Sequence, residues 1–96
     1  MAILVDPAIW PHRGQRFAHL VSDRSHAELH AFAARLGLAR AWFQGDHYDV
    51  PSRVRERAIA LGAEPVSAGE LVRRLRAAGL RSRTRVERLP GEQPPQ

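Results

Sequence analysis

The chain has 96 residues, of which 44% are hydrophobic, and this suits one small globular domain rather than two. Cysteine is absent, which excludes disulfide bonds and thiolate metal sites, so a transition metal would need His, Asp or Glu as ligands. The amino-terminal segment lacks a basic leader, and Asp6 and Pro7 interrupt its apolar run, which argues against a signal peptide or a membrane span. We therefore expect a soluble, cytoplasmic protein.

The net charge of +5 arises in the second half of the chain. Residues 1–49 contain five arginines and five acidic residues, whereas residues 50–96 contain ten arginines and five acidic residues. Lysine is absent. Guanidinium groups bind phosphate well, but a GC-rich genome explains an Ala/Arg/Gly/Leu-rich composition more simply. The charge thus permits nucleic-acid binding without diagnosing it.

The first half of the chain predicts two strands and a helix. Residues 2–6 and 17–22 are short apolar runs rich in β-forming residues, and a loop joins them. Residues 25–28 (Ser-His-Ala-Glu) match a capping box, in which the serine hydroxyl and the glutamate carboxylate accept from free backbone amides of the first turn. Apolar residues at helical spacing predict a helix over about residues 26–36, which Gly37 ends.

The second half predicts two more strands and two more helices. Residues 41–44 (Ala-Trp-Phe-Gln) form a third short apolar run, and residues 64–66 form a fourth. Pro51 suits the first turn of a helix, so we expect a helix from residue 51 or 52 to residue 61. A second capping box at residues 67–70 opens a third helix, and Gly79 closes it.

The alternation of strands and helices predicts an α/β fold. Parallel neighbours need a crossover connection of about a dozen residues, and helices supply it. We expect residues 1–80 to form a single small layered domain, with a mainly parallel sheet of about four strands and three helices. Residues 81–96 are expected to be a basic extension, either an edge strand or an extended tail over residues 81–89, followed by a disordered Pro-rich end.

Polar side chains follow the predicted strands, where a ligand would bind. In a parallel sheet, ligands lie outside the carboxyl ends of the strands, so residues distant in sequence would converge there. Two or three carboxylates with a histidine can hold a divalent ion, and magnesium or manganese suits carboxylate oxygens. The candidate catalytic residues are Asp6, Asp23, His47 and Asp49, and the candidate metal ligands among them are Asp6, Asp23 and Asp49.

Further candidates would bind the ligand itself. Arg13 and His12 would contact an anion, and His12 or His47 would carry a proton. Trp10 and Tyr48 would form walls of the pocket. These residues favour a pocket for an anionic, phosphate-bearing small molecule such as a nucleotide, and hence a metal-assisted phosphoester hydrolase or nucleotide-handling enzyme. The alternative is a non-catalytic nucleic-acid- or protein-binding module that uses the arginine-rich carboxyl-terminal helices.

Each candidate also has a purely structural interpretation. Asp6 could end a strand, Asp23 could form a turn before a helix, and Asp49 could cap one. His19, in the middle of a predicted strand, is more typical of a histidine packed in the core than of a ligand. Trp42 is likewise more typical of core packing than of base stacking.

Five sequence blocks resemble, in order, those of a small family found in bacterial and phage genomes, domain-of-unknown-function family 4031: VDPAIWPHRG, FAHLVSD, ELHAFAARLGL, WFQGDHYDVP and ALGAEPVSAGELVRRLRAAG. The resemblance covers roughly residues 3–80, and the tail beyond about residue 81 departs from it. It implies no activity, cofactor or substrate, but it strengthens the expectation that the polar matches form one site. The matching positions are Asp6, Trp10, Arg13, Gly14, His19, Leu20, Asp23, Leu29, His30, Gly37, Trp42, Phe43, Gln44, His47, Tyr48, Asp49, Gly62 and Ala63.

Overall fold

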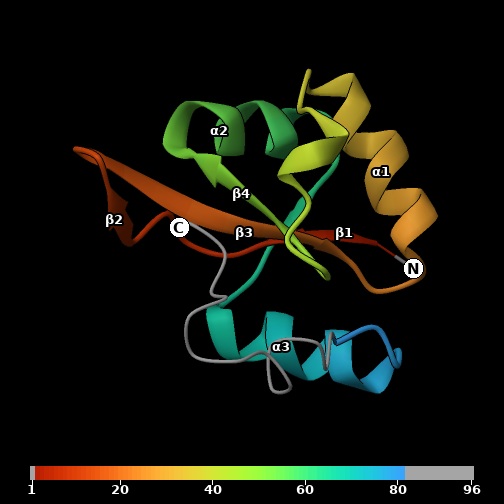
Figure 1. Ribbon diagram of the computed structural model, residues 1–96. Coiled ribbons are helices and arrows are strands. Elements are labelled where there is room, and N and C mark those ends of the chain that lie inside the picture. Colours follow the sequence, from red (N-terminus) through yellow and green to blue (C-terminus); the bar gives the residue numbers. More distant parts are fainter. Residues whose placement is uncertain (1, 82–96) are drawn as a thin grey trace, which may run out of the picture.

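The computed structural model describes residues 2–81, which fold into three layers (Figure 1). A five-stranded sheet lies in the middle, helices α1 and α2 cover one face, and helix α3 packs on the other. No helix in this part of the chain is long and apolar enough to cross a membrane. The elements are β1 (Ile3–Val5), β2 (Trp10–His12), β3 (Gln15–Ser22), α1 (His26–Arg35), the 3-10 turn η1 (Arg40–Trp42), β4 (Tyr48–Pro51), α2 (Ser52–Ala60), β5 (Glu64–Pro65) and α3 (Ala68–Ala77).

Strand β3 is the centre of the sheet, and its two edges pair with different strands. At Leu20, β3 pairs with both β1 and β4, and at Phe17 it pairs with both β2 and β4. Strands β1 and β2 therefore share one edge of β3, and β4 occupies the other. These three pairings are antiparallel, and β1 pairs with β5 in parallel.

The α/β prediction is confirmed, but the prediction of a mainly parallel sheet of about four strands is wrong, because the sheet is mixed and has five strands. The turn between β2 and β3 explains the difference. Arg13 and Gly14 both have positive φ, at 51° and 78°, which is the backbone of a tight hairpin turn. A tight hairpin makes its two strands antiparallel, so β3 returns along β1 and β2 without a crossover helix.

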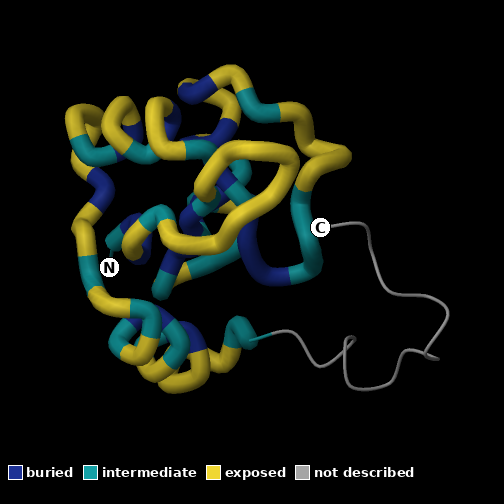
Figure 2. Tube along the Cα trace, turned by 90° about the vertical axis from the view of Figure 1, so that its left-hand side faces the viewer, coloured by how far each residue is buried: buried dark blue, intermediate teal, exposed yellow. Residues whose placement is uncertain are grey.

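Each face of the sheet buries its own hydrophobic cluster. Side chains alternate between faces along β3, so Ala18 and Leu20 join the cluster under α1 and α2, whereas Val21 joins Leu4 under α3. In Figure 2 the buried stretches lie between the layers and exposed residues cover the outside. The cluster under α3 is the smaller one and is completed by Leu71 and Leu75. Beside this smaller cluster, the side chains of His19 on β3 and Asp49 on β4 remain partly exposed.

Helices α1 and α3 begin at the predicted capping boxes. The Ser25 hydroxyl accepts from the Glu28 amide at 3.0 Å, and the Ser67 hydroxyl accepts from the Glu70 amide at 3.1 Å. The Glu28 carboxylate accepts from the buried Ser22 hydroxyl at 2.6 Å, and that hydroxyl in turn accepts from the Ser25 amide at 3.1 Å. Ser22 thereby joins the end of β3 to the start of α1.

Two segments differ from the predicted elements. Residues 41–44 were expected to form a strand, but the turn η1 ends there at Trp42, whose side chain is 54% exposed. The strand lies later, at β4, where Tyr48 and Val50 alternate inward and fill the core. Strand β2 lies in the segment that was expected to be a loop, and all three of its residues are exposed. The expected edge strand or tail over residues 81–89 lies, from residue 82 onward, outside the described residues.

We predict that Asp23→Asn lowers the free energy of unfolding at pH 7 by about 1–2 kcal/mol. Asp23 accepts from the Ala2 amide at 2.6 Å and from Arg74 Nη2 at 2.7 Å, and an asparagine amide cannot accept from both. Urea unfolding at pH 7 measures the loss. Glu70→Gln is the control, because the Glu70–Arg73 pair is exposed to solvent and should contribute much less to stability than the Asp23 contacts. An equal loss in both variants would contradict the prediction.

Candidate metal centre

A row of polar side chains crosses the face of the sheet beside α3. His19 on β3 and Asp49 on β4 are register partners. The backbone of His19 turns away from β4, because its amide donates to Asp6 Oδ1 at 2.6 Å and its carbonyl accepts from the Asp6 amide at 3.2 Å. His19 and Asp49 therefore form a non-hydrogen-bonded pair, in which facing side chains lie closest. His47 precedes Asp49 by two residues, so it lies on the same face.

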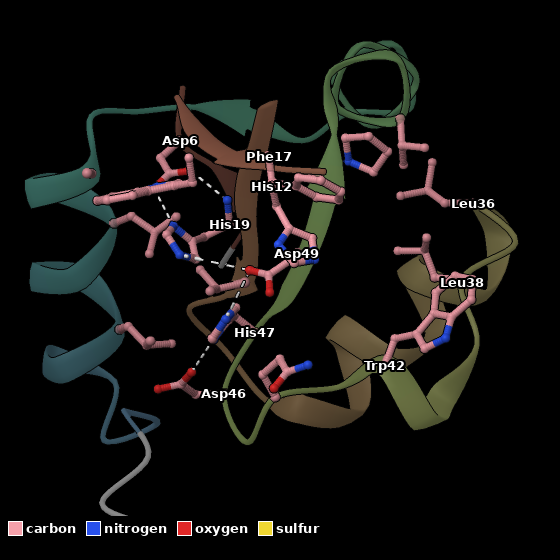
Figure 3. Close-up of a pocket in the computed structure, with 18 of the residues that line it drawn as sticks. Asp6, His12, Phe17, His19, Leu36, Leu38, Trp42, Asp46, His47 and Asp49 are labelled. Atoms are coloured by element: carbon pink, nitrogen blue, oxygen red, sulfur yellow. Dashed lines mark hydrogen bonds and ion pairs between the residues drawn. The ribbon is translucent and has the colours of Figure 1, made fainter. Parts of the chain in front are cut away.

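Three donor atoms converge at the centre of this row (Figure 3). Asp49 Oδ1 lies 3.2 Å from His47 Nε2 and 3.9 Å from His19 Nε2. One ligand atom from each of the three residues lies within 4.8 Å of the other two. Donors that bind a tetrahedral ion at about 2.1 Å are about 3.4 Å apart. Small side-chain shifts would therefore let the three residues surround one ion.

Each histidine is held from behind by a buried carboxylate. His19 Nδ1 lies 2.8 Å from Asp6 Oδ2, and His47 Nδ1 lies 2.6 Å from Asp46 Oδ1. Asp6 is 1% exposed and Asp46 is 0% exposed. A carboxylate that accepts the Nδ1 proton fixes the tautomer whose lone pair is on Nε2. Both rings thus present Nε2 toward Asp49, an arrangement typical of histidines that bind metals.

The environment of His47 favours its protonated form. Burial lowers the pKa of His47, but hydrogen bonds to Asp46 and Asp49 and the charges of these carboxylates outweigh burial and raise the pKa to about 9. Burial raises the pKa of Asp49, but the hydrogen bond and charge of His47, with the charges of His19 and His12, lower it overall. Asp49 is therefore an anion at neutral pH, and a divalent ion would take the place of the proton on His47 Nε2.

The cluster opens into a pocket of about 1040 Å³ (Figure 3). The pocket extends from the cluster to Trp42 and Leu38, on the far side of β4. The side chains of His19 and Asp49 are 30% and 27% exposed, so a ligand can reach both without a change of the fold. Other side chains that line the pocket come from the β2–β3 hairpin and from α2, namely Trp10, His12, Phe17, Arg53 and Arg57.

Among the predicted catalytic residues, Asp6, His47 and Asp49 lie together and Asp23 does not. Because β3 runs antiparallel to β1, the end of β3 lies beside the start of β1, opposite the end that Asp6 occupies. There Asp23 contacts the Ala2 amide and Arg74. Asp6 holds His19 and does not face Asp49 across an ion site. The three expected metal ligands Asp6, Asp23 and Asp49 are therefore not brought together.

The predicted ligand-binding residues are also divided. Trp10 and His12 line the pocket, and Trp10 packs edge-on against His19 with ring centroids 5.5 Å apart. Tyr48 points to the opposite face of the sheet, where it is buried and its hydroxyl lies 2.8 Å from His30 Nδ1. Arg13 is exposed in the β2–β3 turn and is not among the described residues that line the pocket.

Two residues of the cluster were not predicted as site residues. His19 was interpreted as a core histidine, but its apolar neighbours Ala18 and Leu20 occupy the core face, so alternation along the strand already places His19 on the other face. Asp46 precedes β4 and is fully buried beside His47. No sequence pattern distinguishes such a carboxylate from an exposed turn residue.

The structure thus defines a mixed α/β domain that presents two carboxylate-backed histidines and an aspartate in an open pocket. The chain belongs to the family described as "Protein of unknown function (DUF4031)", whose model matches residues 3–78, so the resemblance based on the sequence blocks is confirmed. No curated protein and no solved structure matches the chain. The matched range includes the three donor residues and the two carboxylates that contact the histidines, namely Asp6, His19, Asp46, His47 and Asp49.

We predict that Asp6→Asn lowers the affinity for Zn²⁺ by about 10- to 100-fold without removing a metal ligand. The Asp6 carboxylate accepts from the His19 amide and from His19 Nδ1, and an asparagine can accept from only one of them. Competition with a chromophoric chelator measures the affinity, and circular dichroism checks the fold. An unchanged affinity would show that Asp6 does not orient His19.

Proposed function

We propose that this domain is a metal-dependent phosphoester hydrolase whose divalent ion is bound by His19 Nε2, His47 Nε2 and the Asp49 carboxylate. The proposal is carried by one observation, the convergence of these three donors in front of two rings that buried carboxylates hold from behind. The donor side of the cluster faces the pocket, so an ion there would be accessible to substrate.

The donor set favours a transition metal over magnesium. Two of the three donors are imidazole nitrogens, which suit zinc, iron, nickel or copper, whereas magnesium prefers oxygen ligands and keeps several waters. Manganese also binds a mixture of nitrogen and oxygen donors, but less tightly than the other transition metals do. We therefore propose Zn²⁺ as the bound ion. A site of three carboxylates would instead have favoured magnesium or manganese.

Three protein ligands leave at least one position on the ion for water or substrate. An ion in such a site lowers the pKa of bound water and polarises a phosphoryl oxygen. The water oxygen would form a bond to phosphorus while the bond from phosphorus to the leaving oxygen breaks. His12, which lines the same pocket, would supply the proton that the leaving oxygen takes.

Arginines on α2 support an anionic substrate. Arg53 and Arg57 are exposed, lie one helical turn apart and both line the pocket. The acidic residues of the pocket, Asp6, Asp46 and Asp49, each contact a histidine of the cluster. The open part of the pocket therefore presents the guanidinium groups of Arg53 and Arg57, which could bind a phosphate.

The alternative, a binding module that uses the arginine-rich helices alone, is less well supported on α3. Arg73 pairs with Glu70, and Arg74 pairs with Asp23 and Glu64. These arginines are thus already engaged within the domain. A phosphate-binding role fits the arginines of α2 better.

Hydrolysis of bis(p-nitrophenyl) phosphate tests the proposed function. Zinc-loaded wild-type protein should release p-nitrophenolate, and chelation should abolish the release. His19→Gln should lose activity, whereas Glu56→Gln, an exposed acidic residue of α2 that does not line the pocket, should keep it. Equal activity of the His19→Gln protein would attribute the hydrolysis to another site, and no activity with any divalent transition metal would contradict the proposal.

A further inference from the structure

Two exposed tryptophans share the pocket with the metal cluster. Trp10 is 47% exposed and Trp42 is 54% exposed, although large aromatic side chains normally bury most of their surface. Both line the pocket. Trp10 lies on β2 beside His19, and Trp42 lies in η1, in the segment that leads to β4. Trp10 packs against His19 of the cluster, whereas Trp42 lies at the other end of the pocket, on the far side of β4 (Figure 3).

Two arginines of α2 line the same pocket as the tryptophans. Arg53 and Arg57 face the pocket, and neither forms an ion pair within residues 2–81. Arg74 differs, because two acidic partners hold it. The pocket thus offers arginines without an acidic partner and exposed tryptophans, and single-stranded nucleic-acid sites use such groups to bind phosphates and to stack bases.

We propose that the substrate is the phosphodiester backbone of an unpaired nucleic-acid strand, with a base stacked on Trp10, another on Trp42, and flanking phosphates held by Arg53 and Arg57. This inference rests on the proposed hydrolase and names its substrate. In a duplex both faces of each base are covered by neighbouring pairs, so a duplex cannot use the two indoles. A mononucleotide can use only one of them.

The reaction balances with water as the only co-reactant. The water oxygen bonds to the phosphorus between two nucleotides, and the bond from that phosphorus to one sugar oxygen breaks. The released sugar oxygen takes a proton from His12 and becomes a hydroxyl, and the proton that the water loses on attack restores His12. The products are two shorter strands, one of which ends in a phosphate and the other in that hydroxyl.

Fluorescence anisotropy with a labelled single-stranded oligothymidylate tests the inference. The full chain is used in excess chelator, so that binding is measured without cleavage. Trp42→Ala and Trp10→Ala should each weaken binding about tenfold, and Trp42→Phe should retain most of it because phenylalanine also stacks. Arg53→Gln and Arg57→Gln should each reduce the slope of log affinity against log salt by about 0.7. Arg76→Gln, an exposed arginine of α3 outside the pocket, should change the slope by much less.

Each outcome of this experiment is decisive. Absence of strand binding, full binding by both Trp→Ala variants, or an equal effect of Arg76→Gln and Arg53→Gln would overturn the inference. Thymidine monophosphate or the matching duplex binding as tightly as the single strand would overturn it too. If strand binding fails while zinc-loaded protein still hydrolyses bis(p-nitrophenyl) phosphate, the substrate inference is lost and the hydrolase remains. If strand binding holds but His19→Gln cleaves the oligonucleotide as the wild type does, the hydrolase is lost instead.

Discussion

Asp49→Asn will lower the affinity for Zn²⁺ by more than about 100-fold, the upper end of the loss expected when only a supporting residue is replaced. Asp49 contributes the one anionic donor of the set, and its Oδ1 lies within 3.9 Å of both Nε2 atoms. Asparagine has nearly the same shape, so the side chain remains while its charge is removed. Isothermal titration of the metal-free protein with Zn²⁺ measures the affinity.

Asp23→Asn is the matched control for this measurement, because it makes the same chemical change at a carboxylate that the antiparallel path of β3 places away from the cluster. We expect its affinity for Zn²⁺ to stay within about twofold of the wild type, since independent sites affect one another little. A loss in Asp23→Asn as large as the loss in Asp49→Asn would favour the site of Asp6, Asp23 and Asp49 that the sequence suggested.

The metal-free protein will lose about 3 kcal/mol of stability as the pH rises from about 6 to above 9, through His47. The pKa of His47 is raised from 6.5 to about 9 in the folded state. A raised pKa means that the folded state binds the proton more tightly, so the stabilisation is fully present below pH 6.5 and is lost as the pH rises through 9. Urea unfolding in chelator at both ends of this range measures it.

Asp46→Asn separates this effect from other groups that titrate in the same range. Asp46 lies 2.6 Å from His47 Nδ1 and its charge helps to raise the pKa of His47, so the variant should show a much smaller pH dependence. At pH 6 it should also be less stable by about 3 kcal/mol, because it leaves a buried imidazolium with one fewer anionic partner. The same pH dependence in both proteins would refute the role of the Asp46–His47 pair.

Local sequence patterns predicted the helices well, because their limits depend on neighbouring residues. Ser25 and Ser67 cap α1 and α3 as expected, and glycines follow their ends. Strand direction was not predictable in the same way. It depends on a hairpin in which a non-glycine residue, Arg13, adopts positive φ, and no residue pattern there announced a tight turn.

The sequence predicted the site residues that lie close together along the chain. It did not predict which residues are brought together by pairing between strands. His47 and Asp49 stand two apart, so one strand brings them to one face. His19 joins them only through the register between β3 and β4, and Asp23 leaves them only because β3 is antiparallel to β1. Such long-range pairing is not contained in any local segment, which is why the sequence indicated the right residue types but a different ligand set.

The most direct test of the metal centre is anomalous diffraction at the zinc edge from crystals grown with Zn²⁺. We predict one peak about 2.0–2.2 Å from His19 Nε2, His47 Nε2 and an Asp49 oxygen, with Asp6 and Asp46 still bonded to the Nδ1 atoms. No peak at the cluster in crystals that bind zinc elsewhere, such as beside Asp23, would contradict the account.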